Sequence, residues 1–154
     1  MSLKDELGFL KPVKHKGHET LLNIIVTANL LIKEAQKLFR PYGLTNAQFD
    51  VLMILETQSE NGTLNQTELG HMLLVNRSNV TGLVDRMEQA GWVRRIPDGE
   101  DRRINLVEIT DNGMKILDST KNVYMKRIEE ITSVLSDNEK NLLVEILEKI
   151  RKKI

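Results

Sequence analysis

Residues 65–109 read NQTELGHMLLVNRSNVTGLVDRMEQAGWVRRIPDGEDRRINLVEI. The first part of this stretch contains two short runs in which apolar residues recur at helical spacing. Asn65 with Glu68 has the pattern of a helix-capping box, and Asn76 is a favourable N-cap residue for a second helix. The apolar sides expected to be buried are Leu69, Met72 and Leu73 in the first run, and Val80, Leu83, Val84 and Met87 in the second. The stretch therefore predicts two short helices joined by a tight turn.

A β-hairpin is predicted directly after the second helix. Gly91 is a helix stop, residues 92–96 and 104–109 have the composition of strands, and residues 97–101 have that of a turn. Two helices and a hairpin in this order are the winged form of the helix-turn-helix. A helix in the major groove of duplex DNA leaves such a hairpin over nearby phosphates and the minor groove, where cations are favoured. Residues 44–110 are thus predicted to form a DNA-binding domain.

The second predicted helix has a polar outer side, and the hairpin has a cationic loop. The outer side carries Arg77, Asn79, Thr81, Asp85 and Arg86, the first hairpin strand carries Arg94 and Arg95, and the loop carries Arg102 and Arg103. A helix-turn-helix pattern alone is a weak indication of DNA binding, because any pair of adjacent short helices has the same spacing. The joint placement of cations on the helix and the hairpin favours DNA.

Each of these residues also has a reading without DNA. Arg77 and Arg86 suit a solvated helix face, paired with Asp85 or Glu88. The loop arginines suit a hairpin edge that must stay soluble, and a winged helix can also serve as a protein–protein interaction module. Such a module is the main alternative function.

The sequence resembles the MarR family of winged-helix regulators from about residue 18 to residue 152. Residues 101–113 resemble the family's wing, in which Asp-x-Arg leads into a strand, Thr and Gly. Residues 76–88 resemble its recognition helix, and residues 136–139 resemble the start of its last helix. The resemblance implies a mainly α-helical fold with a small β-hairpin wing, and the function of a transcriptional repressor that binds double-stranded DNA.

The resemblance also implies the residues that contact DNA. They are Arg77, Ser78, Asn79, Thr81 and Arg86 on the recognition helix, and Asp101, Arg102 and Arg103 on the wing. The polar helix residues match positions that face the major groove, and the helix arginines match positions near phosphates or base edges. Arg103 would reach the minor groove, while Asp101 would orient the basic groups of the wing. Gly82 stands where the family often has arginine, which removes one contact.

Long helices are predicted on both sides of the DNA-binding domain, over residues 18–43 and 111–154, after an N-terminal arm over residues 1–17. Their apolar residues include Leu21, Ile25, Ile32, Leu143 and Ile146. This apolar surface exceeds what a small winged domain covers, which predicts a partner. In the family these helices form a two-fold dimer, and such a dimer reads a pseudo-palindromic operator with half-sites about one DNA turn apart. A monomeric helical bundle is the alternative.

Composition excludes several classes of function. The chain of 154 residues has no cysteine, which excludes disulfides, thiolate metal sites and peroxide sensing through a thiol. It has 22 basic and 22 acidic residues, so any DNA affinity depends on where the cations lie. His15, His18 and His71 are too scattered for a metal site. Since the sequence also lacks a phosphate-binding glycine loop and a nucleophile–base motif, we expect no cofactor and no enzymatic activity.

The remaining expectations concern location and control. No apolar run is long enough to span a bilayer and no signal peptide is recognisable, which predicts a cytoplasmic protein. The family resemblance implies a small-molecule effector, often aromatic or anionic, bound where the dimer helices meet the DNA-binding domains. Such a ligand acts by favouring one separation of the two recognition helices. The sequence does not identify its residues.

Overall fold

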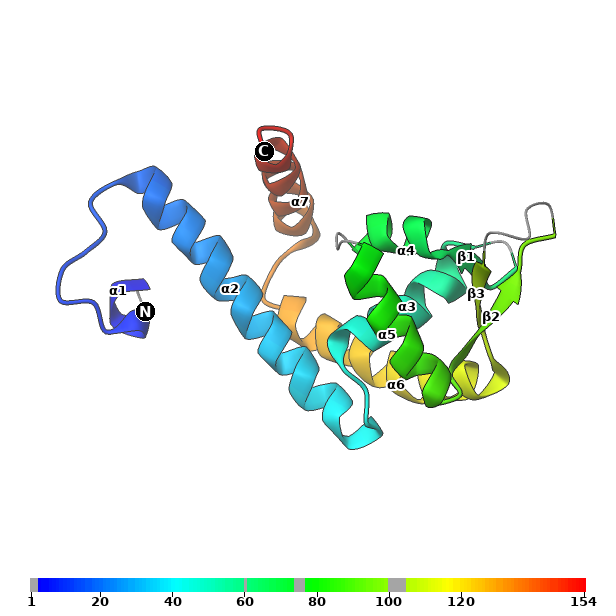
Figure 1. Cartoon of the computed structure of the whole chain (residues 1–154). Coiled ribbons are helices and arrows are strands. Elements are labelled where there is room, and N and C mark those ends of the chain that lie inside the picture. The colour runs from blue at the N-terminus through cyan, green and yellow to red at the C-terminus, as the bar shows by residue number, and fades with distance from the viewer. Residues whose placement is uncertain (1–2, 60, 74–76, 100–104) are drawn as a thin grey trace.

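The computed structural model describes residues 3–59, 61–73, 77–99 and 105–154, with Arg77 and Ser78 described by their backbone alone (Figure 1). Helices α1, α2 and α3 span Leu3–Leu7, Lys16–Phe39 and Asn46–Thr57, and a 3-10 helix, η1, spans Arg40–Tyr42. Helices α4, α5, α6 and α7 span Gln66–Leu73, Arg77–Gln89, Asp111–Thr132 and Asp137–Arg151. Strands β1, β2 and β3 span Thr63–Asn65, Val93–Pro97 and Asn105–Ile109.

The centre of the chain is a winged helix-turn-helix, as predicted. Helices α3, α4 and α5 pack beside an antiparallel sheet with the strand order β1-β3-β2. The sheet is larger than the predicted two-stranded hairpin, because β1 pairs with β3 and places Leu64 opposite Val107. This pairing makes β3 the central strand, and Val107 is fully buried in the core.

The core of this unit comes from one side of each element. The predicted apolar side of α5 is buried throughout, and α3 contributes Val51, Leu52 and Leu55. The prediction for Met72 is wrong, since 44% of this residue is exposed. Helix α4 turns Leu69 and Gly70 inward, which rotates Met72 away from the core by about a quarter of a turn.

Local capping chemistry fixes where several helices begin. Thr45 and Gln48 form the reciprocal capping box of α3, and Ser136 and Glu139 form that of α7. Asn65 caps α4 as predicted, because its side-chain oxygen accepts from two backbone amides of the first turn at 2.9 Å. Asn76, the predicted cap of α5, lies outside the described residues.

The N-terminal region is more helical than predicted. The segment expected to be an arm contains α1, and α2 begins at Lys16, two residues before the expected start at His18. His15 caps α2, since its Nδ1 accepts from the backbone amide of His18 at 3.3 Å. Helix α2 then continues to Phe39, two residues before Pro41, which lies in η1.

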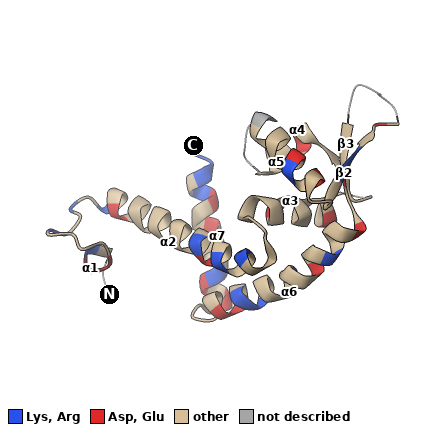
Figure 2. Cartoon of the chain, turned by 60° about the horizontal axis from the view of Figure 1, so that its bottom comes forward, with Lys and Arg blue, Asp and Glu red and all other residues tan. Residues whose placement is uncertain are grey.

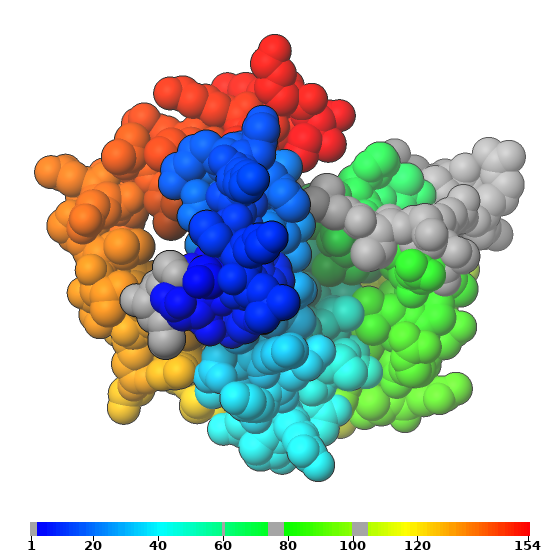
Figure 3. All heavy atoms as spheres, turned by 90° about the vertical axis from the view of Figure 1, so that its left-hand side faces the viewer, coloured from blue at the N-terminus to red at the C-terminus, as the bar shows by residue number. Residues whose placement is uncertain are grey.

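Helices α2 and α6 pack against α3 at one side of the winged unit, and α7 stands apart from that unit (Figure 1). The exposed apolar residues include Leu21, Ile25, Leu31 and Ile32 on α2, and Leu142, Leu143, Val144 and Ile146 on α7. Figure 3 shows a hollow between the N-terminal half of α2 and the end of α6 with α7. The apolar surplus predicted from the sequence is therefore present in the single chain.

Candidate nucleic-acid interface

Helix α5 presents one apolar and one polar side. Val80, Val84 and Met87 are completely buried and fix the helix against the core. The opposite side exposes Asn79, Thr81, Asp85 and Arg86, as the sequence predicted. The structure thus brings together three of the predicted recognition residues, Asn79, Thr81 and Arg86, on one exposed surface.

Arg95 of β2 is bound to α5. Its Nη2 lies 2.5 Å from Asp85 Oδ1, and its Nη1 lies 2.5 Å from Glu88 Oε2. Its backbone amide also donates to Glu88 Oε1 at 3.0 Å. Partial burial alone would lower the pKa of Arg95, but the hydrogen bonds to both carboxylates raise it overall. Arg95 therefore holds α5 against the sheet, and its guanidinium is occupied inside the domain.

This result corrects two expectations from the sequence. Arg95 was expected to add to the cationic surface of the wing, and the acidic residues of α5 were the alternative partners of Arg86. The same alternative for Arg77 stays untested, because its side chain lies outside the described residues. Asp85 and Glu88 instead pair with Arg95, which leaves 21% of the Arg95 side chain exposed. Among the described residues, no carboxylate forms an ion pair with Arg86.

Thr81 belongs to the same network. In the amide orientation that satisfies all neighbours, Gln66 Nε2 donates to Thr81 Oγ1 at 3.0 Å. Gln66 Oε1 then accepts from Arg95 Nε at 3.2 Å and from Nη2 at 3.3 Å. The first residue of α4, the recognition helix and β2 are therefore joined through side chains. This network was not found in the sequence, because its members are too far apart in the chain to form a local pattern.

Arg94 points to a different neighbour. It lies opposite Glu108 in the β2–β3 register and forms an ion pair with that residue. The hydrogen bond that Arg94 donates to the Glu108 carboxylate raises the pKa of Arg94. The Arg94 side chain is still 64% exposed, so this pair lies at the protein surface.

The wing itself is described only at its base. Strands β2 and β3 pair as far as Pro97 and Asn105. The predicted wing residues Asp101, Arg102 and Arg103 lie outside the described residues, and so do the side chains of Arg77 and Ser78 on α5. Figure 2 shows basic and acidic residues interspersed along α6 and α7, in agreement with the equal numbers of both in the sequence.

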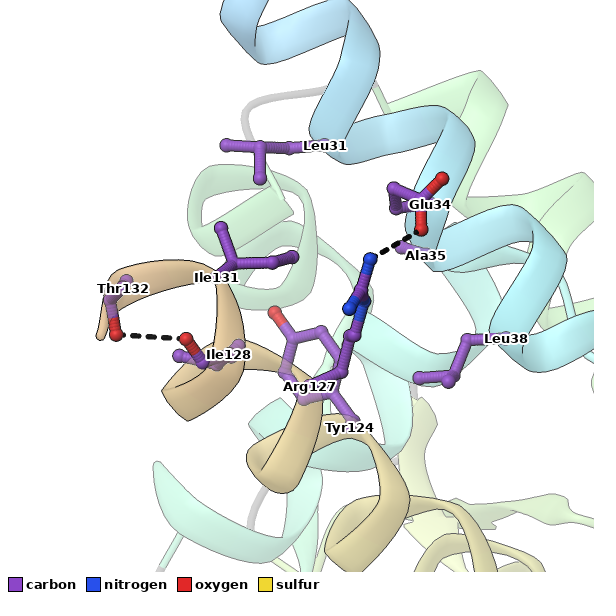
Figure 4. Close-up of a pocket in the computed structure, with 9 residues that line it drawn as sticks. All are labelled: Leu31, Glu34, Ala35, Leu38, Tyr124, Arg127, Ile128, Ile131 and Thr132. Carbon is purple, nitrogen blue, oxygen red and sulfur yellow. Dashed lines mark hydrogen bonds and ion pairs between the residues drawn. The ribbon is translucent and has the colours of Figure 1, made fainter. Parts of the chain in front are cut away.

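A second candidate site is an apolar cavity of about 270 Å³ between α2 and α6 (Figure 4). It is lined by Leu31, Glu34, Ala35, Leu38, Tyr124, Arg127, Ile128, Ile131 and Thr132. Arg127 Nη2 lies 3.1 Å from Glu34 Oε2, and this ion pair is the charged feature of an otherwise apolar lining. Hydrogen bonds from Lys37 and Arg127 lower the pKa of Glu34. Glu34 lies among apolar residues of α2, and this charged residue is the feature of the sequence that could have indicated the cavity.

An aromatic cluster connects the cavity to the winged unit. Phe39 of α2 stacks on Phe49 of α3 with ring centroids 4.2 Å apart, and Tyr124 of α6 meets Phe49 edge-on at 4.8 Å. Burial raises the pKa of the Tyr124 hydroxyl, with a smaller contribution from Asp50. Tyr124 therefore contacts both the cavity and the first helix of the DNA-binding unit.

Other kinds of site are not found in the described part of the chain. No helix there is long and apolar enough to cross a membrane. Nor do the described residues contain a group of three or more histidine or acidic side chains placed to hold a metal ion.

Known proteins are similar to this chain in both sequence and architecture. The family model described as "MarR family" matches residues 44–104. The HTH-type transcriptional regulator PecS of Dickeya dadantii (strain 3937) is 30% identical over 133 residues, which cover 86% of this chain and 80% of PecS. The chain belongs to the MarR family.

Three further known proteins are similar to most of this chain. The transcriptional repressor MprA of Escherichia coli (strain K12) is 29% identical over 120 residues, covering 78% of this chain and 68% of MprA. Sco3205, a MarR family regulator from Streptomyces coelicolor solved in complex with DNA, superposes with a TM-score of 0.82 at 25% identity, covering 94% of this chain and 92% of Sco3205. A mutant of MarR from E. coli complexed with operator DNA gives 0.77 at 26% identity, covering 90% and 99%.

Membership of the MarR family confirms two predictions from the sequence. The winged helix-turn-helix fold is shown by the structure and by its solved neighbours. The relatives are transcriptional regulators, so the chain is a regulator and not an enzyme. The roles of individual residues are a separate matter and are proposed below.

Proposed function

We propose that this chain is a sequence-specific, double-stranded DNA-binding transcriptional repressor that acts as a homodimer in the cytoplasm. The observation that carries the proposal is the exposed polar side of α5, held rigidly by a buried apolar side and by Arg95. A fixed helix with an exposed polar side, next to a β-hairpin, is the arrangement that reads the major groove. Two solved MarR-family relatives were crystallised with DNA, which supports the same use of this surface.

The proposed contacts follow the exposed side of α5 and the wing. Asn79 and Thr81, with Ser78, read base edges, and Arg77 and Arg86 approach phosphates or bases. Thr81 keeps its bond to Gln66, so its methyl group is the part we assign to the base contact. Arg103 and Arg102 of the wing enter or border the minor groove, and Asp101 orients them.

We propose that the helices over residues 18–43 and 111–154 form the dimer, with the arm over 1–17 beside them and residues 44–110 as the DNA-binding domain. The support is the row of exposed apolar side chains on α2 and α7, which a second copy would cover. A two-fold dimer presents two copies of α5, which fits a pseudo-palindromic operator.

The effector site we propose is the cavity between α2 and α6. Its apolar lining suits an aromatic or aliphatic molecule, and Arg127 can bind an acidic group on that molecule in place of Glu34. Because Tyr124 touches both the cavity and Phe49, a bound molecule would change the position of α6 relative to α3. Different affinities for two such arrangements would alter operator binding.

The decisive test is selection of genomic DNA fragments by the purified protein. We expect enrichment of a pseudo-palindromic sequence near the protein's own gene, followed by salt-dependent binding of that duplex. Arg103→Ala should weaken binding and reduce the slope of log affinity against log salt by about 0.9, the value for one phosphate contact.

Two results would contradict these assignments. Enrichment of no sequence, together with stable capture of a protein partner, would support the protein–protein module instead. An unchanged affinity and salt slope for Arg103→Ala would remove this arginine from the contacts while leaving DNA binding itself intact.

A further inference from the structure

Gly82 lies at the centre of the exposed side of α5. The buried residues Val80, Leu83, Val84 and Met87 define the inner side of the helix. Helical spacing of about 3.6 residues per turn places Gly82 nearly opposite their centre. Asn79 and Arg86 lie on one flank of Gly82, and Thr81 and Asp85 lie on the other.

A glycine at this position costs stability, and the fold does not require it. Glycine in a helix interior is less favourable than alanine, because it loses more conformational freedom on folding. The backbone of Gly82 is not in the left-handed region, and an added Cβ would meet only Arg86 Nη1, at an ordinary contact distance of 3.6 Å. Gly113 differs, because an added Cβ there would lie 2.0 Å from the Trp92 carbonyl oxygen.

Because Gly82 has no side chain, the polar residues on its two flanks leave a recess between them. Thr81 is bonded to Gln66 and Asp85 is paired with Arg95, so one flank is held in place by the domain. The opposite flank carries Arg86, whose guanidinium reaches back over the preceding turn of α5 toward Gly82. Between two polar flanks, the bare backbone of Gly82 offers a small apolar floor.

We infer that Gly82 is a specificity residue whose bare backbone receives the C5 methyl group of one thymine in each half-site. The thymine methyl is the apolar group that the major groove presents. Without a Cβ at position 82, the helix can approach the groove floor more closely by about the thickness of a methyl group. The inference rests on the proposed function, because it requires that α5 enters the major groove.

The test compares Gly82→Ala with the unmodified protein on the selected operator and on operators in which single thymines are replaced by uracil. Uracil lacks only the C5 methyl group. We expect Gly82→Ala to raise the melting temperature by about 2–4 °C and to weaken operator binding by about tenfold, with the salt slope unchanged. At one thymine per half-site, uracil should weaken the unmodified protein and restore Gly82→Ala to within about twofold of it.

Gln89→Ala is the matched control. Gln89 is exposed on the same side of α5, two turns further along. This change should leave operator affinity within about twofold. The inference is overturned if Gly82→Ala binds as tightly as the unmodified protein, or if its loss is equal on every uracil operator. If the unmodified protein binds no duplex at all, the proposed function fails first, and the role of Gly82 fails with it.

Discussion

At the scale of single residues, Arg95 and Arg94 are neighbours with different tasks. Arg95 joins two carboxylates of α5 and the Gln66 amide, whereas Arg94, within the described part of the chain, forms an ion pair with Glu108 at the surface. We expect Arg95→Gln to lower the free energy of unfolding by about 1–2 kcal/mol, because it leaves two carboxylates without their partner. Arg94→Gln is the matched control and should cost less than about 1 kcal/mol. Denaturant unfolding of both variants measures the difference, and equal losses would show that Arg95 does not hold α5.

The same pair of residues shows what the sequence could not reveal. The polar side of α5 was predicted correctly, because helical spacing is a local property. The partner of Asp85 was not, because Arg95 lies ten residues further on and reaches it only through the packing of β2 against α5. The wing arginines fall outside the described residues, so their assignment remains a prediction.

At the scale of elements, the helix caps depend on the shortest stretches of sequence. Ser136 and Glu139 satisfy each other's backbone amides within a single turn, so their chemistry needs no distant partner. Glu139 Oε2 accepts from Ser136 Oγ at 2.7 Å and from the Ser136 amide at 2.8 Å, and these bonds lower the pKa of Glu139 below its ordinary 4.5. The stability that this cap adds is therefore present above the ordinary pKa and is lost as the pH falls through the lowered one.

Titration of the Glu139 carboxyl group by NMR tests this cap. We expect a pKa below 4.5 in the unmodified protein and a return toward 4.5 in Ser136→Ala. The same change should destabilise α7 by about 1 kcal/mol, the usual effect of losing an N-cap side chain. An unchanged pKa in Ser136→Ala would mean that the capping box does not form in solution.

Where elements depend on one another, prediction from the sequence was less accurate. Met72 fits the apolar spacing of α4, yet the direction of that short helix is set by Leu69 and Gly70 against the core. The pairing of β1 with β3 joins residues more than forty positions apart, for example Thr63 with Glu108, which no local pattern shows. The cavity between α2 and α6 was missed because its lining residues come from two helices that are far apart in the chain.

At the scale of the whole molecule, the exposed apolar side of α2 is the surface that needs explanation. Ile25 is 54% exposed in the single chain. If a second copy covers it, Ile25→Glu should convert a dimer into a monomer and reduce operator affinity strongly, because a charge would be buried without a partner. Light scattering combined with DNA titration measures both effects.

Asn23→Glu provides the control for this change. Asn23 lies on the polar side of α2, where its amide donates to the Glu19 carbonyl oxygen at 2.8 Å. The added charge should remain solvated there and leave the mass unchanged. A monomeric unmodified protein, or an Ile25→Glu variant that stays dimeric, would refute the assignment of α2 to the dimer.

The three aromatic rings packed together where α2, α3 and α6 meet have a mechanical consequence. Closely packed aromatic rings are stiff and nearly incompressible, so Phe39, Phe49 and Tyr124 leave little slack between these helices. A tilt of α6 would then move α3 by a similar amount, because Tyr124 of α6 packs on Phe49 of α3. In the proposed complex, a small movement at this joint would become a larger one at α5, which lies farther from it.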